Sequence, residues 1–208
     1  MTERSVRAYV GLGANLGDPE ETLVRAVASL AALPGVRLRG VSRLYATKPV
    51  GEPDQPEFRN AVAAIDVPSS GHPATDALAL LRDLKGLERA FGRRPGKRWG
   101  PRELDLDLLV LGRTHLAMER SVGTRSIDAD AEPAKAAKLL VVPHPEARRR
   151  LFVLAPMADL APGLVPPGWG ETVATARRHQ LEREGADAVR PIATWDEVAR
   201  RWRAVQPR

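Results

Sequence analysis

Apolar and turn-forming positions alternate along the first half of the chain and predict strands and helices in turn. An apolar run at residues 9–12 enters a glycine-rich turn and predicts a strand. Asp18 is a natural N-cap and Pro19 suits the first position of a helix, which Pro34 ends. Leucine and valine recur between these residues at helical spacing. The first two elements are therefore a strand and an amphipathic helix.

The following segments continue this alternation. Residues 36–45 and 61–67 have the composition of strands and flank a loop at 47–55 that contains several prolines and glycines. Apolar residues at three-and-four spacing predict a second helix over 73–91, and 104–111 is predicted to be a mostly buried strand. Strands that alternate with helices indicate an α/β or α+β sandwich.

Two segments of the second half depart from this pattern. Residues 119–138 are polar and rich in alanine without apolar periodicity, so we expect a mobile insertion there. We expect residues 169–208 to form a helical extension, because Thr194 and Glu197 make a capping box at the start of an apolar stripe formed by Trp195, Val198, Trp202 and Val205. This helix is predicted to dock on its own domain, residues 1–168, with a self-association surface as the alternative.

Composition and charge narrow the classes of function. The 208 residues contain no cysteine, which excludes disulfide frameworks, thiolate nucleophiles and cysteine-based metal sites. No stretch has the pattern of a signal peptide or a membrane span, so we expect a cytoplasmic protein with no membrane partner. The net charge of +6 and the sequence pI near 10.3 would suit nucleic acid, anionic lipid or a polyphosphate, and total charge alone does not choose among these partners.

Two glycine-containing segments resemble nucleotide-binding loops but do not have the required spacing. The glycines of residues 11–17 are spaced wrongly by one position, and the acidic residue expected about twenty positions later is absent. Residues 92–98 have three positions between glycines where a Walker loop needs four, and Arg98 replaces its Ser or Thr. Neither segment predicts a standard nucleotide site, although the arginines of the second can bind phosphate oxygens.

A pair of carboxylates carries the strongest chemical signal. Asp105 and Asp107 are two positions apart on a predicted strand, so their side chains share a face with attachment points about 6.6 Å apart. That spacing lets both carboxylates hold a pair of hard cations, for which magnesium is the natural candidate. An arginine-rich loop, residues 93–102, directly precedes them. Carboxylates for Mg²⁺ beside arginines for phosphate are the parts that phosphoryl transfer needs.

These residues belong to a longer motif that resembles a known family. Residues 98–109, Arg-Trp-Gly-Pro-Arg-Glu-Leu-Asp-Leu-Asp-Leu-Leu, resemble without a gap the signature of the 6-hydroxymethyl-7,8-dihydropterin pyrophosphokinases of folate biosynthesis. Further blocks occur in the family's order at residues 11–16, 47–60, 84–94 and 142–156. Several motifs in order are more specific than any single pattern.

The resemblance implies an activity and a fold. The family transfers the terminal diphosphate of ATP to the hydroxymethyl group of a reduced pterin and releases AMP. ATP is therefore expected as co-substrate, together with two Mg²⁺ ions bound by Asp105 and Asp107. Arg93 and Arg102 are expected to be catalytic, by neutralising the transferred diphosphate. The implied fold is α+β, with a ferredoxin-like, mostly antiparallel sheet and helices on both faces, and residues 1–168 are the implied catalytic domain.

The resemblance also implies two groups of substrate-binding residues. Those expected to bind the pterin are Thr47, Val50, Phe58, Asn60, Trp99 and Phe152. Those expected to bind ATP are Lys85, Glu88, Arg94, Arg102, His144 and Arg150. The pterin group combines aromatic faces for stacking with an amide for direction, which suits a flat heterocycle. Trp99 is further expected to close over the pterin when its loop folds down.

Two alternative functions follow from the sequence. An RNA-binding module would explain the basic pI, but aromatic residues make up 4% of the chain and no RNP-like string occurs, so nucleic acid is not the expected partner. A protein that keeps the fold without the chemistry is the second alternative, and the intact set of aspartates and arginines argues against it. The sequence leaves association with other folate enzymes open.

Overall fold

Strands and helices alternate through most of the chain. A computed structural model describes residues 4–49, 55–92, 102–120 and 137–204. The strands are β1 Ser5–Ala14, β2 Arg37–Val41, β3 Leu44–Thr47, β4 Phe58–Pro68, β5 Asp105–Leu111, β6 Leu116–Glu119, β7 Lys138–Val142, β8 Val189–Asp196 and β9 Arg201–Ala204. The helices are α1 Pro19–Ala31, α2 Pro73–Ala90, α4 Leu151–Leu160 and α5 Val173–Glu184, and the short 3₁₀ turns are η1 Ala147–Arg149 and η2 Ala186–Ala188.

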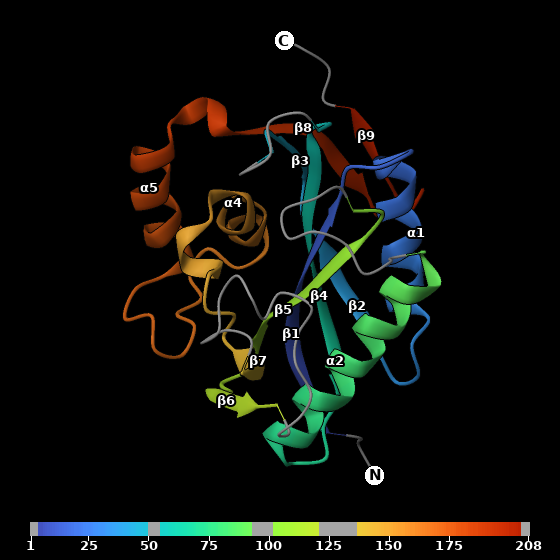
Figure 1. Cartoon of the computed structure of the whole chain (residues 1–208), viewed down its shortest axis with the longest axis vertical. Coiled ribbons are helices and arrows are strands. Elements are labelled where there is room, and N and C mark those ends of the chain that lie inside the picture. The colour runs from blue at the N-terminus through green and yellow to red at the C-terminus, as the bar shows by residue number, and fades with distance from the viewer. Residues whose placement is uncertain (1–3, 50–54, 93–101, 121–136, 205–208) are drawn as a thin grey trace.

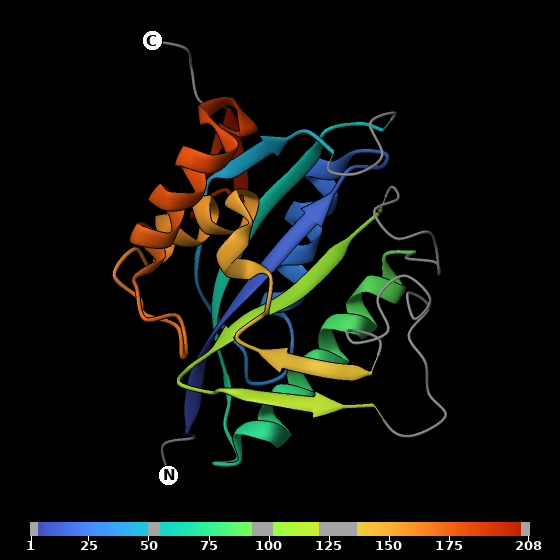
Figure 2. The same ribbon diagram turned by 60° about the vertical axis from the view of Figure 1, so that its left-hand side comes forward.

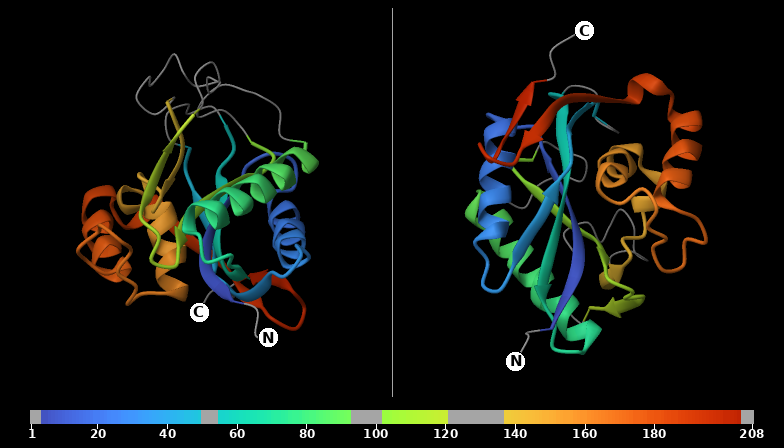
Figure 3. Two further views of the ribbon diagram at one scale, coloured as in Figure 1. Left: turned by 90° about the horizontal axis from the view of Figure 1, so that it is seen from below. Right: turned by 180° about the vertical axis from the view of Figure 1, so that it is seen from behind.

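A seven-stranded sheet forms the middle layer of the molecule (Figure 1). Its strand order is β5-β1-β4-β3-β8-β9, and β2 pairs with the other end of β4. Every pairing within this sheet is antiparallel. Helices α1 and α2 lie on one face and α4 and α5 on the other (Figure 3). The predicted α+β fold, with a mostly antiparallel sheet between helices, is confirmed.

The sheet is buried on both faces because its central strands present apolar side chains in both directions. On β1, Ala8, Val10 and Leu12 belong to the cluster that α1 and α2 cover, whereas Tyr9 belongs to the cluster under α4 and α5. Successive side chains of a strand point to opposite faces. A long central strand can therefore hold two helical layers.

Local signals explain where several elements begin and end. The side chain of Asp18 accepts a hydrogen bond of 3.0 Å from the N–H of Glu21, so the predicted N-cap of α1 is confirmed. The single strand predicted over 36–45 is instead two strands, β2 and β3. Ser42 and Arg43 lie between them. The N–H of Ser42 still donates to the carbonyl of Val62 at 2.9 Å, but the N–H of Val62 donates to Oγ of Ser42 at 2.9 Å instead of to a backbone carbonyl.

The helix predicted to begin at Thr194 is wrong, although the C-terminal extension does contain a helix, α5. The segment with the supposed capping box forms the hairpin β8–β9, in which Trp195 and Trp202 are opposed and pack edge to face with ring centroids 4.7 Å apart. Asp196 accepts from the N–H groups of Val198 and Ala199 and so stabilises the turn. Two tryptophans seven positions apart share a helix face, but they also meet across a short hairpin, where aromatic pairs stabilise strands.

The region after β5 forms a second, smaller ribbon. Strands β6 and β7 pair antiparallel beside the main sheet (Figure 2). They enclose the expected mobile insertion of residues 119–138, of which residues 121–136 lie outside the described part of the chain. Within the described residues, no helix has the length and apolar character that crossing a membrane requires.

Candidate active site

Three neighbouring strands bring a candidate metal ligand and a candidate pterin residue onto one face of the sheet. Asp105 of β5 lies opposite Gly13 of β1, and Gly13 lies opposite Asn60 of β4. Directly opposed residues of antiparallel strands project to the same face. The carboxylate and the amide therefore flank a residue without a side chain. Asp107, two positions further along β5, lies opposite Gly11 on the same face.

The glycine between the two polar side chains is closely approached by one of them. A Cβ placed on Gly13 would lie 3.2 Å from Oδ1 of Asn60, closer than the two groups tolerate without displacement. Gly11 is less restricted, because a Cβ there would meet Cδ2 of Leu109 at 3.4 Å. The two glycines leave the sheet surface between the aspartates and Asn60 uncovered by side chains of β1.

The two aspartates have the character of ligands for a hard cation. Both are half-buried, and Oδ2 of Asp105 accepts a hydrogen bond of 2.7 Å from Nη1 of Arg102. Among the described residues there is no cluster of three or more His, Asp or Glu that could hold a metal by itself. A pair of carboxylates suits Mg²⁺, which is commonly bound by one or two carboxylates and completed by substrate phosphates.

Two candidate pterin residues, Asn60 and Thr47, are hydrogen-bonded to each other. Nδ2 of Asn60 donates to Oγ1 of Thr47 at 2.8 Å, and the two residues are 7% and 6% exposed. In this orientation Oδ1 of Asn60 is the acceptor that faces the gap over Gly13. A buried amide held in one orientation can direct a heterocycle with N–H donors.

The two candidate stacking residues come from separate elements. Phe58 begins β4 opposite Thr47, is half-buried, and lies outside the three hydrophobic clusters of the described residues. Phe152 lies in the first turn of α4, also half-buried, with the guanidinium of Arg150 over its ring at 5.7 Å. One of the candidate ATP residues is thus in contact with a candidate pterin residue.

Two other candidate ATP residues, Lys85 and Glu88, contact the backbone of β5. Oε1 of Glu88 accepts from the N–H of Leu106 at 2.8 Å and from Nζ of Lys85 at 2.7 Å. Glu88 is 2% exposed. The structure therefore places this carboxylate against the strand that carries the two aspartates rather than on an open surface.

His144 lies beside the aspartates after β7. Its backbone N–H donates to the carbonyl of Leu109 at 2.8 Å, and this bond attaches the Pro-His-Pro turn to β5. Burial lowers the pKa of His144, while the charge of Asp107 opposes this shift and that of Arg150 adds to it. Nδ1 accepts from the backbone N–H of Glu146 at 3.3 Å, so the neutral imidazole that burial favours carries its proton on Nε2 and can donate from there.

Four predicted site residues lie outside the described part of the chain. They are Val50, Arg93, Arg94 and Trp99. The structure thus brings together the aspartates, Arg102, Asn60 and Thr47 on the sheet, and the expected closing of Trp99 over the pterin remains a prediction.

Asn15 is a structurally central residue that the sequence did not single out. It is 2% exposed, and its Oδ1 accepts from the N–H of Arg102 at 2.8 Å. Its Nδ2 donates to Oε1 of Gln55 at 3.1 Å and to the carbonyl of Pro56 at 3.2 Å. One amide therefore joins the segment before the aspartates to the segment before Phe58. An asparagine in a glycine turn was the available signal, but such residues usually serve their own turn.

The C-terminal segment also contacts elements of the site. Nη2 of Arg190 on β8 is 3.0 Å from Oε1 of Glu57, which directly precedes Phe58. Glu184 at the end of α5 accepts from the N–H of Leu151 at 3.2 Å and so caps α4 where its own N-cap residue provides no side-chain bond.

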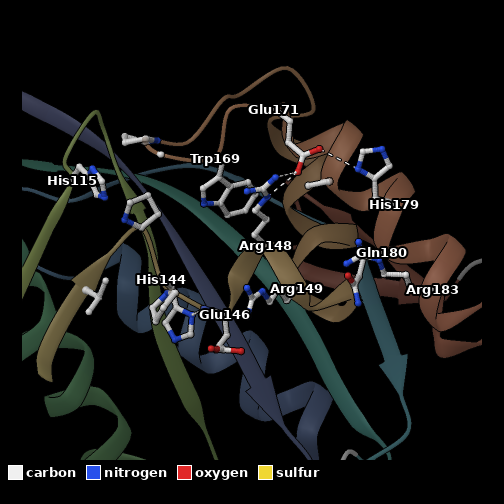
Figure 4. Close-up of a pocket in the computed structure, with 16 residues that line it drawn as sticks. His115, His144, Glu146, Arg148, Arg149, Trp169, Glu171, His179, Gln180 and Arg183 are labelled. Atoms are coloured by element: carbon white, nitrogen blue, oxygen red, sulfur yellow. Dashed lines mark hydrogen bonds and ion pairs between the residues drawn. The ribbon is translucent and has the colours of Figure 1, made fainter. Parts of the chain in front are cut away.

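A pocket elsewhere on the molecule shares one residue with the candidate site (Figure 4). It lies between the Pro-His-Pro turn, η1 and α5, and Glu171 in its wall binds Arg148 at 2.6 Å and His179 at 3.1 Å. Its lining includes His144 but neither aspartate nor Asn60. Its lining is therefore distinct from the face of the sheet that carries the aspartates and Asn60.

Comparisons with known proteins agree with the motif. The sequence pattern of the family described as "7,8-dihydro-6-hydroxymethylpterin-pyrophosphokinase (HPPK)" matches residues 9–162. The 2-amino-4-hydroxy-6-hydroxymethyldihydropteridine pyrophosphokinase of Methylorubrum extorquens is 40% identical over 183 residues, covering 88% of this chain and 98% of that protein. The protein of the same name from Pseudomonas aeruginosa is 40% identical over 161 residues, covering 77% and 84%.

Solved structures show the same fold. The wild-type HPPK-DHPS of Plasmodium falciparum superposes with a TM-score of 0.68 at 12% identity and covers 99% of this chain. The match takes up 51% of that longer chain, so this chain spans about half its length. From the extent of the family match and the identity to its curated relatives, the chain belongs to the 7,8-dihydro-6-hydroxymethylpterin-pyrophosphokinase family.

Proposed function

We propose that this face of the sheet is where the chain transfers the diphosphate of ATP to 6-hydroxymethyl-7,8-dihydropterin, giving AMP and the pterin diphosphate in folate biosynthesis. The observation that carries the proposal is the row formed by Asp105, Gly13 and Asn60. It sets a carboxylate suited to a phosphate-bound cation and an amide suited to a heterocycle on one surface, with no side chain between them. Membership of the pyrophosphokinase family supports the same reaction.

The transfer is a single displacement at the β-phosphorus of ATP. The hydroxymethyl oxygen bonds to that phosphorus, and the bond from the phosphorus to the α,β-bridging oxygen breaks. AMP leaves with the bonding electron pair, and the hydroxyl proton passes to water. No side-chain nucleophile is needed, so the protein's contribution is to position the two substrates and to neutralise charge.

Asp105 and Asp107 are proposed to bind two Mg²⁺ ions together with the phosphates of ATP. Their position on one face of β5, half-buried and beside the bare glycines, supports this role. Bound Mg²⁺ screens the charge of the phosphate oxygens and orients them. Titration of the protein with Mn²⁺ and a non-hydrolysable ATP analogue counts the ions, and one bound ion per chain would correct this part of the proposal.

Arg102 is proposed to move between two anions. In the structure its guanidinium neutralises Asp105. A cation at that carboxylate frees the guanidinium for a phosphate group, with which arginine forms bidentate hydrogen bonds. Arg93, Arg94 and His144 are proposed as further contacts to the triphosphate, on the family resemblance.

Asn60, Thr47, Phe58 and Phe152 are proposed to bind the pterin. The Asn60 amide is held by Thr47 with its carbonyl oxygen presented to the site. Two aromatic side chains from β4 and α4 supply stacking surfaces for the ring.

One assay tests the reaction. Protein, Mg²⁺, ATP and 6-hydroxymethyl-7,8-dihydropterin are mixed, and the products are separated by chromatography. The proposal requires AMP and pterin diphosphate in equal amounts, dependent on the pterin. ADP in place of AMP, or no product, would refute it.

Asp107→Ala tests the site. Removal of a ligand for the phosphate-bound cation is expected to abolish nearly all turnover, while circular dichroism and thermal unfolding stay close to those of the wild type. Asp83→Ala is the matched control, because Asp83 is an exposed carboxylate on α2. Wild-type turnover by Asp107→Ala would place the reaction elsewhere.

A further inference from the structure

Two side chains of α2 form hydrogen bonds with the backbone of Leu106, the β5 residue between the two candidate metal ligands. Oε1 of Glu88 accepts from the N–H of Leu106 at 2.8 Å, and Nζ of Lys85 donates to the carbonyl of the same residue at 3.3 Å. Lys85 and Glu88 are in turn 2.7 Å apart. Both backbone groups of Leu106 are thus satisfied by side chains, where an inner strand would use a neighbouring strand.

The position of β5 in the sheet explains why such partners are needed. β5 stands at the end of the strand order, and within the described residues β1 is its pairing partner in the main sheet. Alternate N–H and C=O groups of an edge strand point away from the sheet and are unpaired unless another element covers them. Glu88 and Lys85 bond to the N–H and C=O groups of Leu106 in place of water.

The choice of charged groups for this purpose is costly. The side chain of Glu88 is 3% exposed and that of Lys85 is 41% exposed. Taking a carboxylate out of water costs several kcal/mol in general, and its ion pair and hydrogen bonds offset that cost only when the geometry is good. Apolar residues would cover the edge without the cost of burying a charge. They would, however, leave the N–H and C=O groups of Leu106 without hydrogen-bond partners.

Leu106 lies between the two aspartates, so a displacement of its backbone would move both of them. The side chain of Leu106 is buried in the cluster beneath α1 and α2, whereas Asp105 and Asp107 project to the opposite face. Mg²⁺ requires oxygen ligands at 2.0–2.1 Å in nearly octahedral geometry, so a small shift or twist of this strand changes its affinity.

We propose that Glu88 and Lys85 are positioning residues, which hold β5 at Leu106 so that the two aspartates bind the phosphate-bound cation. This inference rests on the proposed function of the aspartates. It gives Glu88 a role in the protein's own scaffold, whereas the family resemblance implies contact with ATP.

The test measures cation binding apart from turnover. Mn²⁺ binding to the protein with a non-hydrolysable ATP analogue is followed by electron paramagnetic resonance. Glu88→Ala is expected to weaken Mn²⁺ binding about 10- to 100-fold, the range found when a residue that orients a metal ligand is removed. The Mg²⁺ concentration for half-maximal AMP formation is expected to rise in parallel, while KM for the pterin stays unchanged.

Two further variants make the outcome specific. Glu88→Gln keeps an acceptor for the Leu106 N–H and loses the charge that pairs with Lys85, so it is expected to retain part of the Mn²⁺ affinity. Because Gln has nearly the same shape, it also serves if Glu88→Ala does not fold. Lys85→Met is expected to have a smaller effect, since it leaves the bond from Leu106 to Glu88 in place.

Two carboxylates of the same helix are matched controls. Asp83 is exposed, whereas Asp76 is 8% exposed and accepts hydrogen bonds from Ser69 and Ser70. Asp76→Asn is expected to lower the thermal midpoint without changing Mn²⁺ affinity, and Asp83→Asn is expected to change neither.

The failure of this inference is distinct from failure of the proposed function. Wild-type Mn²⁺ affinity in a folded Glu88 variant, or an equal loss in Asp76→Asn, would overturn the positioning role while wild-type AMP formation stands. Absence of AMP from the wild-type protein would instead overturn the proposed function itself.

Discussion

Replacing Asn15 with alanine removes a side chain that joins three segments around the site. Its amide makes one hydrogen bond to the backbone of Arg102, one to the side chain of Gln55 and one to the backbone of Pro56. The backbone N–H of Asn15 also donates to the carbonyl of Arg102 at 3.1 Å. That last bond survives the substitution, so the variant tests the side chain alone.

The size of the effect follows from the bonds that are lost. Each hydrogen bond contributes about 1 kcal/mol net, and a donor left buried without a partner costs about 1–3 kcal/mol. Asn15 is 2% exposed, so water cannot fully replace its amide. Asn15→Ala is therefore expected to lower the free energy of unfolding by about 2–4 kcal/mol. For a chain of this size that corresponds to a loss of about 5–15 °C in the thermal midpoint.

Urea unfolding and steady-state kinetics together measure the two consequences. The KM values for both ATP and the pterin are expected to rise, because Arg102 and the segment before Phe58 lose their common anchor. Asn15→Asp keeps the acceptor for Arg102 and loses the two donors, so it is expected to raise KM for the pterin more than KM for ATP. Ser29→Ala on α1, where the hydroxyl bonds within its own helix, is the control. A loss below about 1 kcal/mol with both KM values unchanged would refute this reasoning.

Two shorter predictions concern the sheet. Gly13→Ala places a Cβ 3.2 Å from Oδ1 of Asn60 and is expected to raise KM for the pterin several-fold, as steady-state kinetics will show; an unchanged KM would contradict the proposed pterin site. The hydrogen bond from Arg7 lowers the pKa of Asp66, with burial opposing the shift. Because the folded-state pKa is the lower one, this carboxylate stabilises the fold above about pH 4 and the contribution is lost as the pH falls further. Asp66→Asn should therefore narrow the difference in urea stability between pH 7 and pH 3, and an identical difference would contradict it.

Elements marked by local residues could be predicted from the sequence. Asp18 and Pro19 fix the start of α1 through a cap and a preset backbone angle, both of which act within four residues. Helix α2 follows from its apolar spacing and spans Pro73–Ala90 against a predicted 73–91. The Asp105 and Asp107 spacing likewise fixes that the two carboxylates share a face, since this depends on strand geometry alone.

The terminal hairpin could not be predicted, because its structure depends on partners far along the chain. Trp195 and Trp202 satisfy both a helical stripe and an opposed pair in a hairpin. Two contacts with distant residues favour the hairpin over the helix. β8 is hydrogen-bonded to β3, and the carbonyl of Ser42 accepts from Nε1 of Trp202 at 2.9 Å. Tertiary pairing of this kind overrides local propensity.

In the candidate site, too, some features follow from the sequence and others arise only in the fold. The chemical groups were visible in the motif. The supporting roles of Asn15 and Glu88 were not, because these side chains bond to backbone groups 87 and 18 positions away. No fixed spacing in the sequence relates a side chain to a distant backbone group with which it forms a hydrogen bond. The supports of the site are buried polar side chains that satisfy backbone groups next to functional residues, and only the folded chain brings them there.

The segment after α4 also supports residues of the site. Arg190 pairs with Glu57 beside Phe58, and Glu184 caps the helix that carries Phe152. The two proposed stacking residues, which lie on different elements, are thus each held by the C-terminal segment, while the aspartates are held by α2. Asn15 anchors both halves of the site, but each half also has a support of its own. Damage to the C-terminal contacts is therefore expected to affect the pterin side first.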